Sequence, residues 1–224
     1  MLFTGLMITS GMAYAHQGNY EEAGGLQLQV LVLHKNILGP EHPQTLTSVA
    51  NLAVSYLEHG KYEEAGELQL KVLDLSKNVL GPEHPDTLNR MANLAITYSN
   101  QGKYEEAGEL GLKVLDLNEK VLGPEHPQTL TSMANLAVTY SAQGKCEEAG
   151  ELELKVLDLC KNVLGPDHPD TLASMANLAA TYSNQGKYEE AGELQSKVLN
   201  LHKKVLGLEH PATLTSMGNL AVIY

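Results

Sequence analysis

Hydrophobic residues recur at spacings of three and four along two adjacent stretches in the middle of the chain. In the first stretch they are Leu88, Met91, Leu94, Ala95 and Tyr98. In the second stretch, which follows Gly102, they are Tyr104, Ala107, Leu110, Val114, Leu117 and Val121. Such spacing places the apolar side chains on one side of an α-helix. The pattern therefore predicts a pair of amphipathic helices between residues 85 and 122, the second longer than the first.

The residues that connect one helix pair to the next are nearly the same throughout the chain. The phrase LGPEHPQTL occupies residues 38–46 and returns unchanged at 122–130, and close variants stand at 80–88, 164–172 and 206–214. Its glycine suits the end of a helix, and its second proline suits the first position of the next helix. All nine prolines lie in these connectors. The phrase therefore predicts a helix end followed by a helix start, once every 42 residues.

This period divides the whole chain, which we expect to form one domain. The expected repeats are at about 1–42, 43–84, 85–126, 127–168 and 169–210, with a partial repeat at 211–224. They amount to about 5.5 repeats and eleven helices. The opening residues are interpreted as a repeat helix rather than a signal peptide, because Met7 and Tyr14 are in register with later repeats and no basic segment precedes them. Since the last repeat is incomplete, we expect an excerpt from a longer array.

The order of residues within a repeat resembles the tetratricopeptide family. The quoted positions are Met91, Leu94, Ala95, Tyr98, Gly102, Tyr104 and Ala107, with Met in the family's Trp position and Ala in its Gly position. The repeat length and the segments Asn-Leu-Ala, Gly-Lys-Tyr-Glu-Glu-Ala and Leu-Gly-Pro-x-His-Pro are similar to kinesin light chain. The resemblance implies an all-α fold, a right-handed α-α solenoid with the shorter helices on its inner side.

One departure from light chain is a glycine inside each longer helix, where light chain usually has Glu. These glycines are Gly66, Gly108, Gly150 and Gly192. A glycine within a helix costs about 1 kcal/mol relative to alanine. The departure therefore predicts either a softer helix or unusually close packing at that turn.

Composition and charge limit the classes of binding partner and the cellular compartment that we expect for the protein. The formal charge of −12 disfavours binding to nucleic acid or to an anionic membrane, and no stretch is long enough to span a bilayer. Cys146 and Cys160 lie on one predicted helix, separated by roughly 21 Å, which is beyond disulfide reach. We therefore expect free thiols and a cytoplasmic protein.

No group of residues predicts catalysis, a metal or a cofactor. The connectors carry His42, His84, His126, His168 and His210. Zinc needs three or four ligands at one point, whereas these histidines are a full repeat apart. We expect each imidazole to bond a carbonyl at a helix end instead. The Glu-Glu doublets recur at helix starts and are interpreted as solvated, so the chain is expected not to be an enzyme.

The side of the shorter helices opposite the core stripe is expected to bind a peptide, because it is uncharged and carries an asparagine in every repeat. The expected peptide-binding residues are Asn51, Val54, Asn89, Asn93, Ile96, Asn100, Thr131, Asn135, Val138, Asn177 and Asn219. An Asn side chain offers a donor and an acceptor, which suits contact with the backbone of an extended peptide. Light chain holds cargo peptide with groove asparagines of this type. The alternative, that these amides only bridge neighbouring helices, stays open.

These features predict a noncatalytic scaffold that binds an extended segment of another protein. Two other functions remain open at this point. The array could stack end to end through uncapped terminal repeats, forming a dimer or a fibre. It could also be the sensor or ligand-binding part of a larger multidomain regulator.

Overall fold

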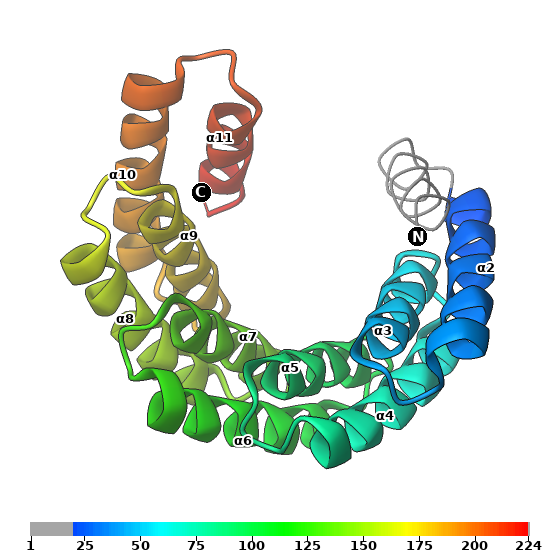
Figure 1. The fold of residues 1–224 in the computed structure, drawn as a ribbon. Coiled ribbons are helices and arrows are strands. Elements are labelled where there is room, and N and C mark those ends of the chain that lie inside the picture. Colours follow the sequence, from blue (N-terminus) through cyan, green and yellow to red (C-terminus); the bar gives the residue numbers. More distant parts are fainter. Residues whose placement is uncertain (1–19, 224) are drawn as a thin grey trace. The chain divides into compact units, whose positions relative to one another are not determined.

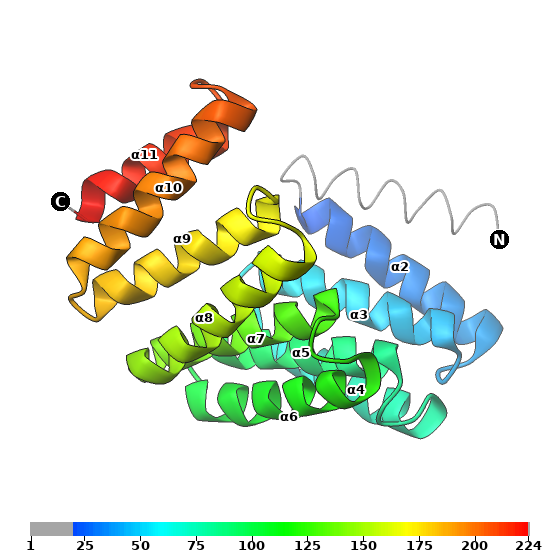
Figure 2. The ribbon, with the colours of Figure 1, turned by 90° about the vertical axis from the view of Figure 1, so that its left-hand side faces the viewer.

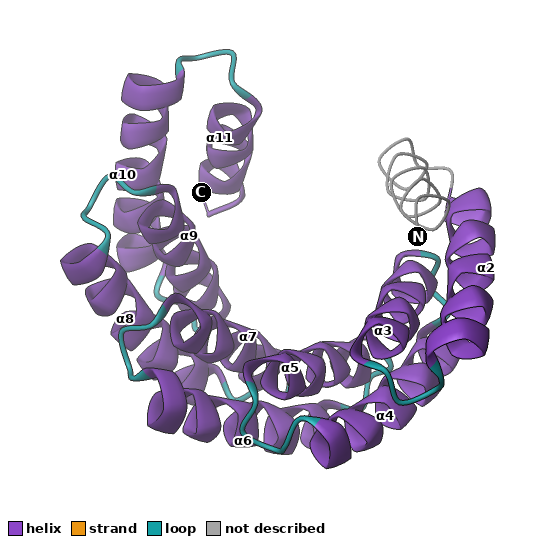
Figure 3. Cartoon of the chain, in the orientation of Figure 1, coloured by secondary structure: helices purple, strands orange, loops and turns teal. Residues whose placement is uncertain are grey.

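The computed structural model describes residues 20–223, with side chains from residue 24 onward, and all regular structure in this range is α-helical (Figures 1 and 3). The helices are α2 (Tyr20–Leu38), α3 (Pro43–Glu58), α4 (Tyr62–Val79), α5 (Pro85–Asn100), α6 (Tyr104–Leu122), α7 (Pro127–Ala142), α8 (Cys146–Val163), α9 (Pro169–Asn184), α10 (Tyr188–Leu206) and α11 (Pro211–Ile223). Shorter and longer helices alternate, as the hydrophobic pattern predicts. The first of the eleven expected helices, with Met7 and Tyr14, lies outside the described residues.

Each shorter helix begins with a proline that follows a capping histidine. Nδ1 of His84 accepts a hydrogen bond from the backbone N–H of Asp86 at 3.2 Å, and Pro85 is the first residue of α5. The same bond is made by His42, His126, His168 and His210. It satisfies an amide that has no partner inside the helix. The expectation that these imidazoles bond helix-end carbonyls is therefore wrong, because the ring nitrogen acts as an acceptor for the helix that follows.

Each longer helix ends before a glycine in the left-handed region. Gly123 follows the last residue of α6 and has a φ of 92°, a conformation that favours glycine. Its carbonyl oxygen accepts a hydrogen bond from Oγ1 of Thr129 at 2.7 Å, on the first turn of α7. The same bond joins Thr45 to Gly39, Thr171 to Gly165 and Thr213 to Gly207. The connector therefore ends one helix and starts the next with its own residues.

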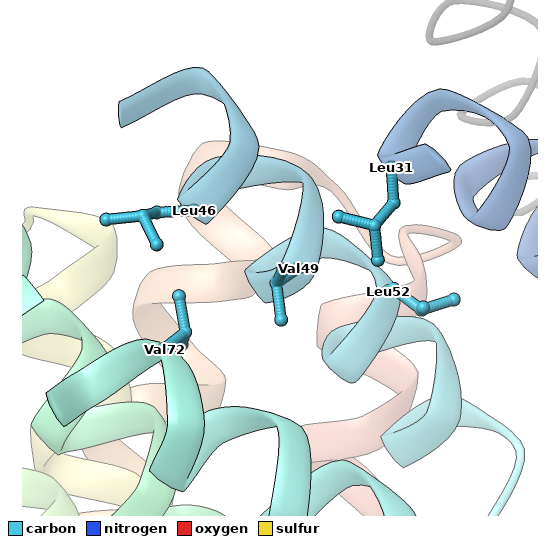
Figure 4. Packing of buried hydrophobic residues seen from close by; sticks show 5 residues of the cluster. All are labelled: Leu31, Leu46, Val49, Leu52 and Val72. Atoms are coloured by element: carbon cyan, nitrogen blue, oxygen red, sulfur yellow. The ribbon is translucent and has the colours of Figure 1, made fainter. Parts of the chain in front are cut away.

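The chain divides into two compact units, residues 1–117 and 118–224. In the first unit, two apolar clusters hold consecutive helices together. The cluster in Figure 4 joins α2, α3 and α4 through Leu31, Leu46, Val49, Leu52 and Val72. The next cluster joins α4, α5 and α6 through Leu73, Leu88, Met91, Leu94 and Val114. Each helix of the unit is thus stabilised by burying one apolar side against its neighbours.

In the second unit, one apolar cluster joins α8, α9 and α10. Figure 2 labels these three helices. The buried members of the cluster are Leu157, Leu172, Met175, Leu178 and Val198. The predicted core stripe is confirmed on α5, α7 and α9, where its methionines and leucines are buried. In particular, Met91, Met133 and Met175 fill the core at the same repeat position. The prediction is wrong for Tyr104 and Val121 near the ends of α6, which are 39% and 41% exposed. The side of each shorter helix away from this stripe remains available for contact with other molecules.

Candidate functional site

The residues expected to bind a peptide lie on the shorter helices, away from the core. In the first unit they are Asn51 and Val54 on α3, and Asn89, Asn93, Ile96 and Asn100 on α5. In the second unit they are Thr131, Asn135 and Val138 on α7, Asn177 on α9 and Asn219 on α11. Asn51 and Asn135 are half-buried and the others are exposed. Each unit therefore presents its own set of predicted contact residues.

Within the described residues, the recurring asparagines make no side-chain hydrogen bond to a neighbouring helix. Within residues 24–223, none of the side-chain amides of Asn51, Asn93, Asn135, Asn177 and Asn219 has a hydrogen-bond partner from the protein. The backbone carbonyls of Asn93 and Asn135 do take part in the structure, because they accept bonds from Thr97 and Thr139. The amide groups themselves are left with unused donors and acceptors.

A pocket of about 230 Å³ opens between α7, α8 and α9 in the second unit. Its lining residues are Glu125, Pro127, Leu130, Thr131, Ala134, Val156, Cys160, Val163, Leu164, Asp170, Ala173, Ser174 and Asn177. Thr131 and Asn177, both predicted from the sequence, are therefore brought together. The walls are mainly apolar, whereas Glu125 and Asp170 are acidic and exposed. The expectation of a neutral face thus fails at this end of the shorter helices.

A second pocket, of about 250 Å³, lies between α9 and α11. Asn184 and Asn219 line it together with Gln195 of α10. Gln195 is buried, and its Nε2 donates a hydrogen bond to the carbonyl of Ser216 at 3.3 Å. This pocket places Asn219 beside polar groups that the sequence pattern did not single out.

Two buried charged side chains distinguish otherwise similar repeats. Arg90 is 9% exposed, and its Nη1 donates to the carbonyl of Leu46 at 3.0 Å. Burial lowers the pKa of the Arg90 guanidinium, and the nearby Asp86 carboxylate acts in the opposite direction. Glu153 is 6% exposed, and burial raises the pKa of its carboxyl group, opposed by a hydrogen bond from Thr181. The sequence pattern did not predict that either residue would be buried, although each differs from the residues at the equivalent position of other repeats.

Comparison with known proteins identifies the repeat. A tetratricopeptide repeat profile matches residues 5–68, 49–109, 89–162 and 143–191, and a second tetratricopeptide profile matches residues 171–212. The chain belongs to the tetratricopeptide repeat family. The all-α solenoid class predicted from the sequence is thereby confirmed. Tetratricopeptide repeats typically form scaffolds for protein–protein interactions.

Solved structures show which tetratricopeptide proteins are similar. One similar structure contains the nearly identical repeats of a Podosopora anserina protein that is provisionally assigned as a kinesin light chain. Its sequence is 34% identical to that of this chain. The TM-score is 0.81, and the match covers 89% of this chain and 94% of that one. The predicted likeness to light chain repeats is therefore confirmed. A search of curated protein sequences found no match.

More distant structures share the fold alone. BtubC (BKLC) from P. vanneervenii is 20% identical with a TM-score of 0.76, and the match covers 90% of this chain and 80% of that one. A Pyrococcus horikoshii signal transduction ATPase with a tetratricopeptide sensor is 15% identical with a TM-score of 0.69, over 98% of this chain and 33% of that one. Within the part of the tetratricopeptide chain that the structure describes, no helix has both the length and the apolar content needed to cross a membrane.

Proposed function

We propose that this tetratricopeptide array binds an extended segment of another protein along the exposed side of its shorter helices. The observation that carries the proposal is the recurrence of an asparagine whose amide has no partner among residues 24–223. A polar group that bridged helices would have its hydrogen bonds satisfied within the protein. These amides instead have donors and acceptors left for the backbone of a bound peptide.

An exposed aliphatic side chain accompanies these asparagines. Residues three apart in a helix lie on the same side. Asn93 therefore shares a side of α5 with the exposed Ile96, and Asn135 shares a side of α7 with the exposed Val138. Val54 and Val222 stand in the same relation to Asn51 and Asn219. Each such pair offers hydrogen bonds and apolar contact together, which suits an extended polypeptide.

The proposal is tested with peptides selected from a random displayed library against the whole chain. The double variant Asn93→Ala and Asn135→Ala removes one such asparagine from each unit. It is expected to weaken peptide binding at either unit about fivefold, since one lost hydrogen bond contributes about 1 kcal/mol. The matched control is Asn78→Ala with Asn162→Ala, two exposed asparagines on the longer helices α4 and α8. Unchanged affinity in the first double variant, with unchanged circular dichroism, would rule out this role for the asparagines.

Self-association is a second candidate function, favoured by one observation. Leu214 of α11 is 55% exposed, whereas the leucines at the same position of earlier repeats are at most 6% exposed. Those residues are Leu46, Leu88, Leu130 and Leu172. In earlier repeats the following longer helix covers this position, and for Leu214 that helix would come after residue 224. The exposed leucine therefore suits packing against that helix of a longer chain as well as contact with a second copy. With self-association, light scattering would show a mass that rises with concentration, and Leu214→Lys would abolish that rise.

The remaining expectations stay predictions. These are a single continuous array over residues 1–224, a sensor role within a larger regulator, and a cytoplasmic location. Cys146 and Cys160 are both unpaired, which supports a reducing compartment such as the cytoplasm.

A further inference from the structure

Arg90 occupies a buried position between α3 and α5 in the first unit. Its guanidinium reaches across to the carbonyl oxygen of Leu46, 3.0 Å away, and its side chain is almost fully buried. Asp86 lies one turn earlier on α5 and attracts the positive charge. The fold therefore contains a place that receives an arginine side chain, with a helix carbonyl and a carboxylate to meet it.

The same place recurs in the second unit without the arginine. Two repeats further along the chain, Leu130 occupies the position equivalent to Leu46 and Asp170 the position equivalent to Asp86. The position equivalent to Arg90 is occupied by Ser174. All three of these later residues line the pocket of about 230 Å³ between α7, α8 and α9. A serine lacks the long aliphatic stem and guanidinium that fill this space in the first unit. The pocket therefore corresponds to the space that Arg90 occupies.

The chemistry of the pocket suits a cation on an apolar stem. Val156, Val163 and Ala134 provide apolar walls, and Glu125 and Asp170 provide negative charge. No lysine or arginine is among its lining residues in the described part of the chain. The volume is ample, since an apolar cavity of about 150 Å³ accommodates benzene. A long side chain can bury its methylene groups in such a site while its charged end meets the carboxylates.

We propose that this pocket receives an arginine side chain of a bound polypeptide, as the equivalent space in the first unit receives Arg90. Its guanidinium donates to the carbonyl oxygen of Leu130 and faces the carboxylate of Asp170. The planar guanidinium has five donors, so it can bond a carbonyl and a carboxylate together, which the compact lysine ammonium does less well. The inference rests on the proposed function, because Thr131 and Asn177 line the same pocket and belong to the expected peptide-binding face.

Cys160 provides a reporter for occupancy of the pocket, because it is one of the lining residues. Only 3% of its surface is exposed and Oγ of Ser174 donates to its Sγ at 3.7 Å, so its alkylation is slow and a reagent must enter the pocket to reach it. The background variant is Cys146→Tyr, which leaves Cys160 as the only cysteine and restores the tyrosine that stands at this position in Tyr62, Tyr104 and Tyr188. The measurement is the rate at which uncharged iodoacetamide alkylates Cys160. The probes are the N-acetyl amides of arginine, lysine and citrulline, the last of which is close to arginine in shape but uncharged.

The arginine derivative is expected to slow alkylation of Cys160, and the citrulline derivative is expected to leave it unchanged. Asp170→Asn should weaken the arginine effect about tenfold, as loss of one charge-assisted partner does. Equal protection by citrulline, equal protection by lysine, or no protection by any probe would each overturn the arginine assignment. None of these results depends on Asn93 or Asn135, so failure here is distinct from failure of the proposed function.

Exchange of residues between the units gives an independent test. Ser174→Arg places the residue of the first unit in the pocket, so Cys160 should become unreactive and the probes should have no further effect. The reciprocal variant, Arg90→Ser with Ser76→Cys, recreates the pocket in the first unit, because Ser76 stands where Cys160 stands. In a background without the native cysteines, this new thiol should be protected by the arginine derivative. A reciprocal variant that folds, as judged by circular dichroism, but shows no arginine-dependent protection would contradict the proposal.

Discussion

A Cβ atom on Gly66 would lie 2.8 Å from Nε2 of Gln101. That Nε2 donates a hydrogen bond to the carbonyl of Tyr62 at 2.6 Å, at the start of α4. Gly150 and Gln185 repeat the relationship in the second unit, where a Cβ atom would lie 3.0 Å from Nε2. The glycine that distinguishes these repeats from light chain is therefore a site of close approach between a longer helix and the shorter helix that follows it.

Gly66→Ala is expected to stabilise the protein less than Gly24→Ala does. Gly24 holds the same repeat position in α2, but a Cβ atom there would meet nothing within 4 Å. Gly24→Ala should therefore raise the free energy of unfolding by about 1 kcal/mol through helix propensity. Gly66→Ala must displace the Gln101 amide, and the lost hydrogen bond should offset about 1 kcal/mol. Urea denaturation followed by circular dichroism measures the free energy of unfolding of both variants.

Coupling between the two positions gives the control for this prediction. In a Gln101→Ala background, Gly66→Ala should recover the stabilisation seen at Gly24, because no amide remains to be displaced. An equal gain from Gly66→Ala with and without Gln101 would show that the close approach has no energetic consequence.

Glu153→Gln is expected to stabilise the second unit at neutral pH and much less at acidic pH. Burial raises the pKa of Glu153, so the folded state favours the protonated carboxyl group. The stabilising contribution of the Glu153 side chain is therefore fully present below the unfolded-state pKa of this residue. It is lost as the pH rises through its folded-state pKa. Glutamine stands at this position in Gln69 and Gln195 and resembles the protonated acid in shape. The gain at pH 7 should be about 1 kcal/mol, typical of relieving a buried unsatisfied group.

The measurement for Glu153 is denaturation at pH 4 and pH 7 in parallel with the unchanged protein. Glu151→Gln serves as the control, because Glu151 is an exposed carboxylate on the same helix. A gain of equal size at both pH values would contradict the electrostatic origin.

His84→Ala should lower the free energy of unfolding by about 1 kcal/mol, the usual effect of removing an N-cap acceptor. His84→Asn should retain most of the stability, since Asn is a favourable N-cap residue. Thermal denaturation of the two variants compares them directly. If both variants lost the same stability, the Nδ1 bond to Asp86 would not be the source of the effect.

Leu172→Ala and Leu214→Ala should differ strongly although the two leucines hold the same repeat position. Leu172 is buried in the cluster that joins α8, α9 and α10, so its truncation should cost about 2–5 kcal/mol. Leu214 is largely exposed, so its truncation should cost well under about 1 kcal/mol in the monomer. Denaturation at low protein concentration tests this difference, and a large cost at Leu214 that grows with concentration would support self-association.

Local chemistry in the sequence was sufficient to predict the helices and their faces. Pro85 and Gly123 mark a helix start and a helix end that the structure confirms, and the spacing of Leu88, Met91 and Leu94 identifies the buried side. The same spacing places Asn93 and Ile96 on the opposite, exposed side. These features depend on residues within one or two turns of each other.

The features that sequence analysis missed depend on residues from different helices. Gly66 is explained by Gln101, and Arg90 bonds the carbonyl of Leu46 two helices earlier. The pocket beside Ser174 lies where Arg90 fills the equivalent space in the first unit, which only becomes visible once the neighbouring helices are placed. The predicted role of the connector histidines was wrong because His84 has the extended backbone of an N-cap residue, from which its ring accepts a hydrogen bond from the backbone N–H of Asp86.

The connector has a consequence for how such a chain can change in length. Its histidine accepts a bond from an amide of the next helix, and its glycine carbonyl accepts one from a threonine on the first turn of that helix. Both contacts therefore come from within the connector and the turn after it. A gene segment that encodes one period can consequently be duplicated or deleted without losing these contacts at the junction. Growth or loss of whole periods is therefore a low-cost evolutionary step, and a substitution such as Arg90 in place of the Ser found in other repeats can then give one copy its own binding chemistry.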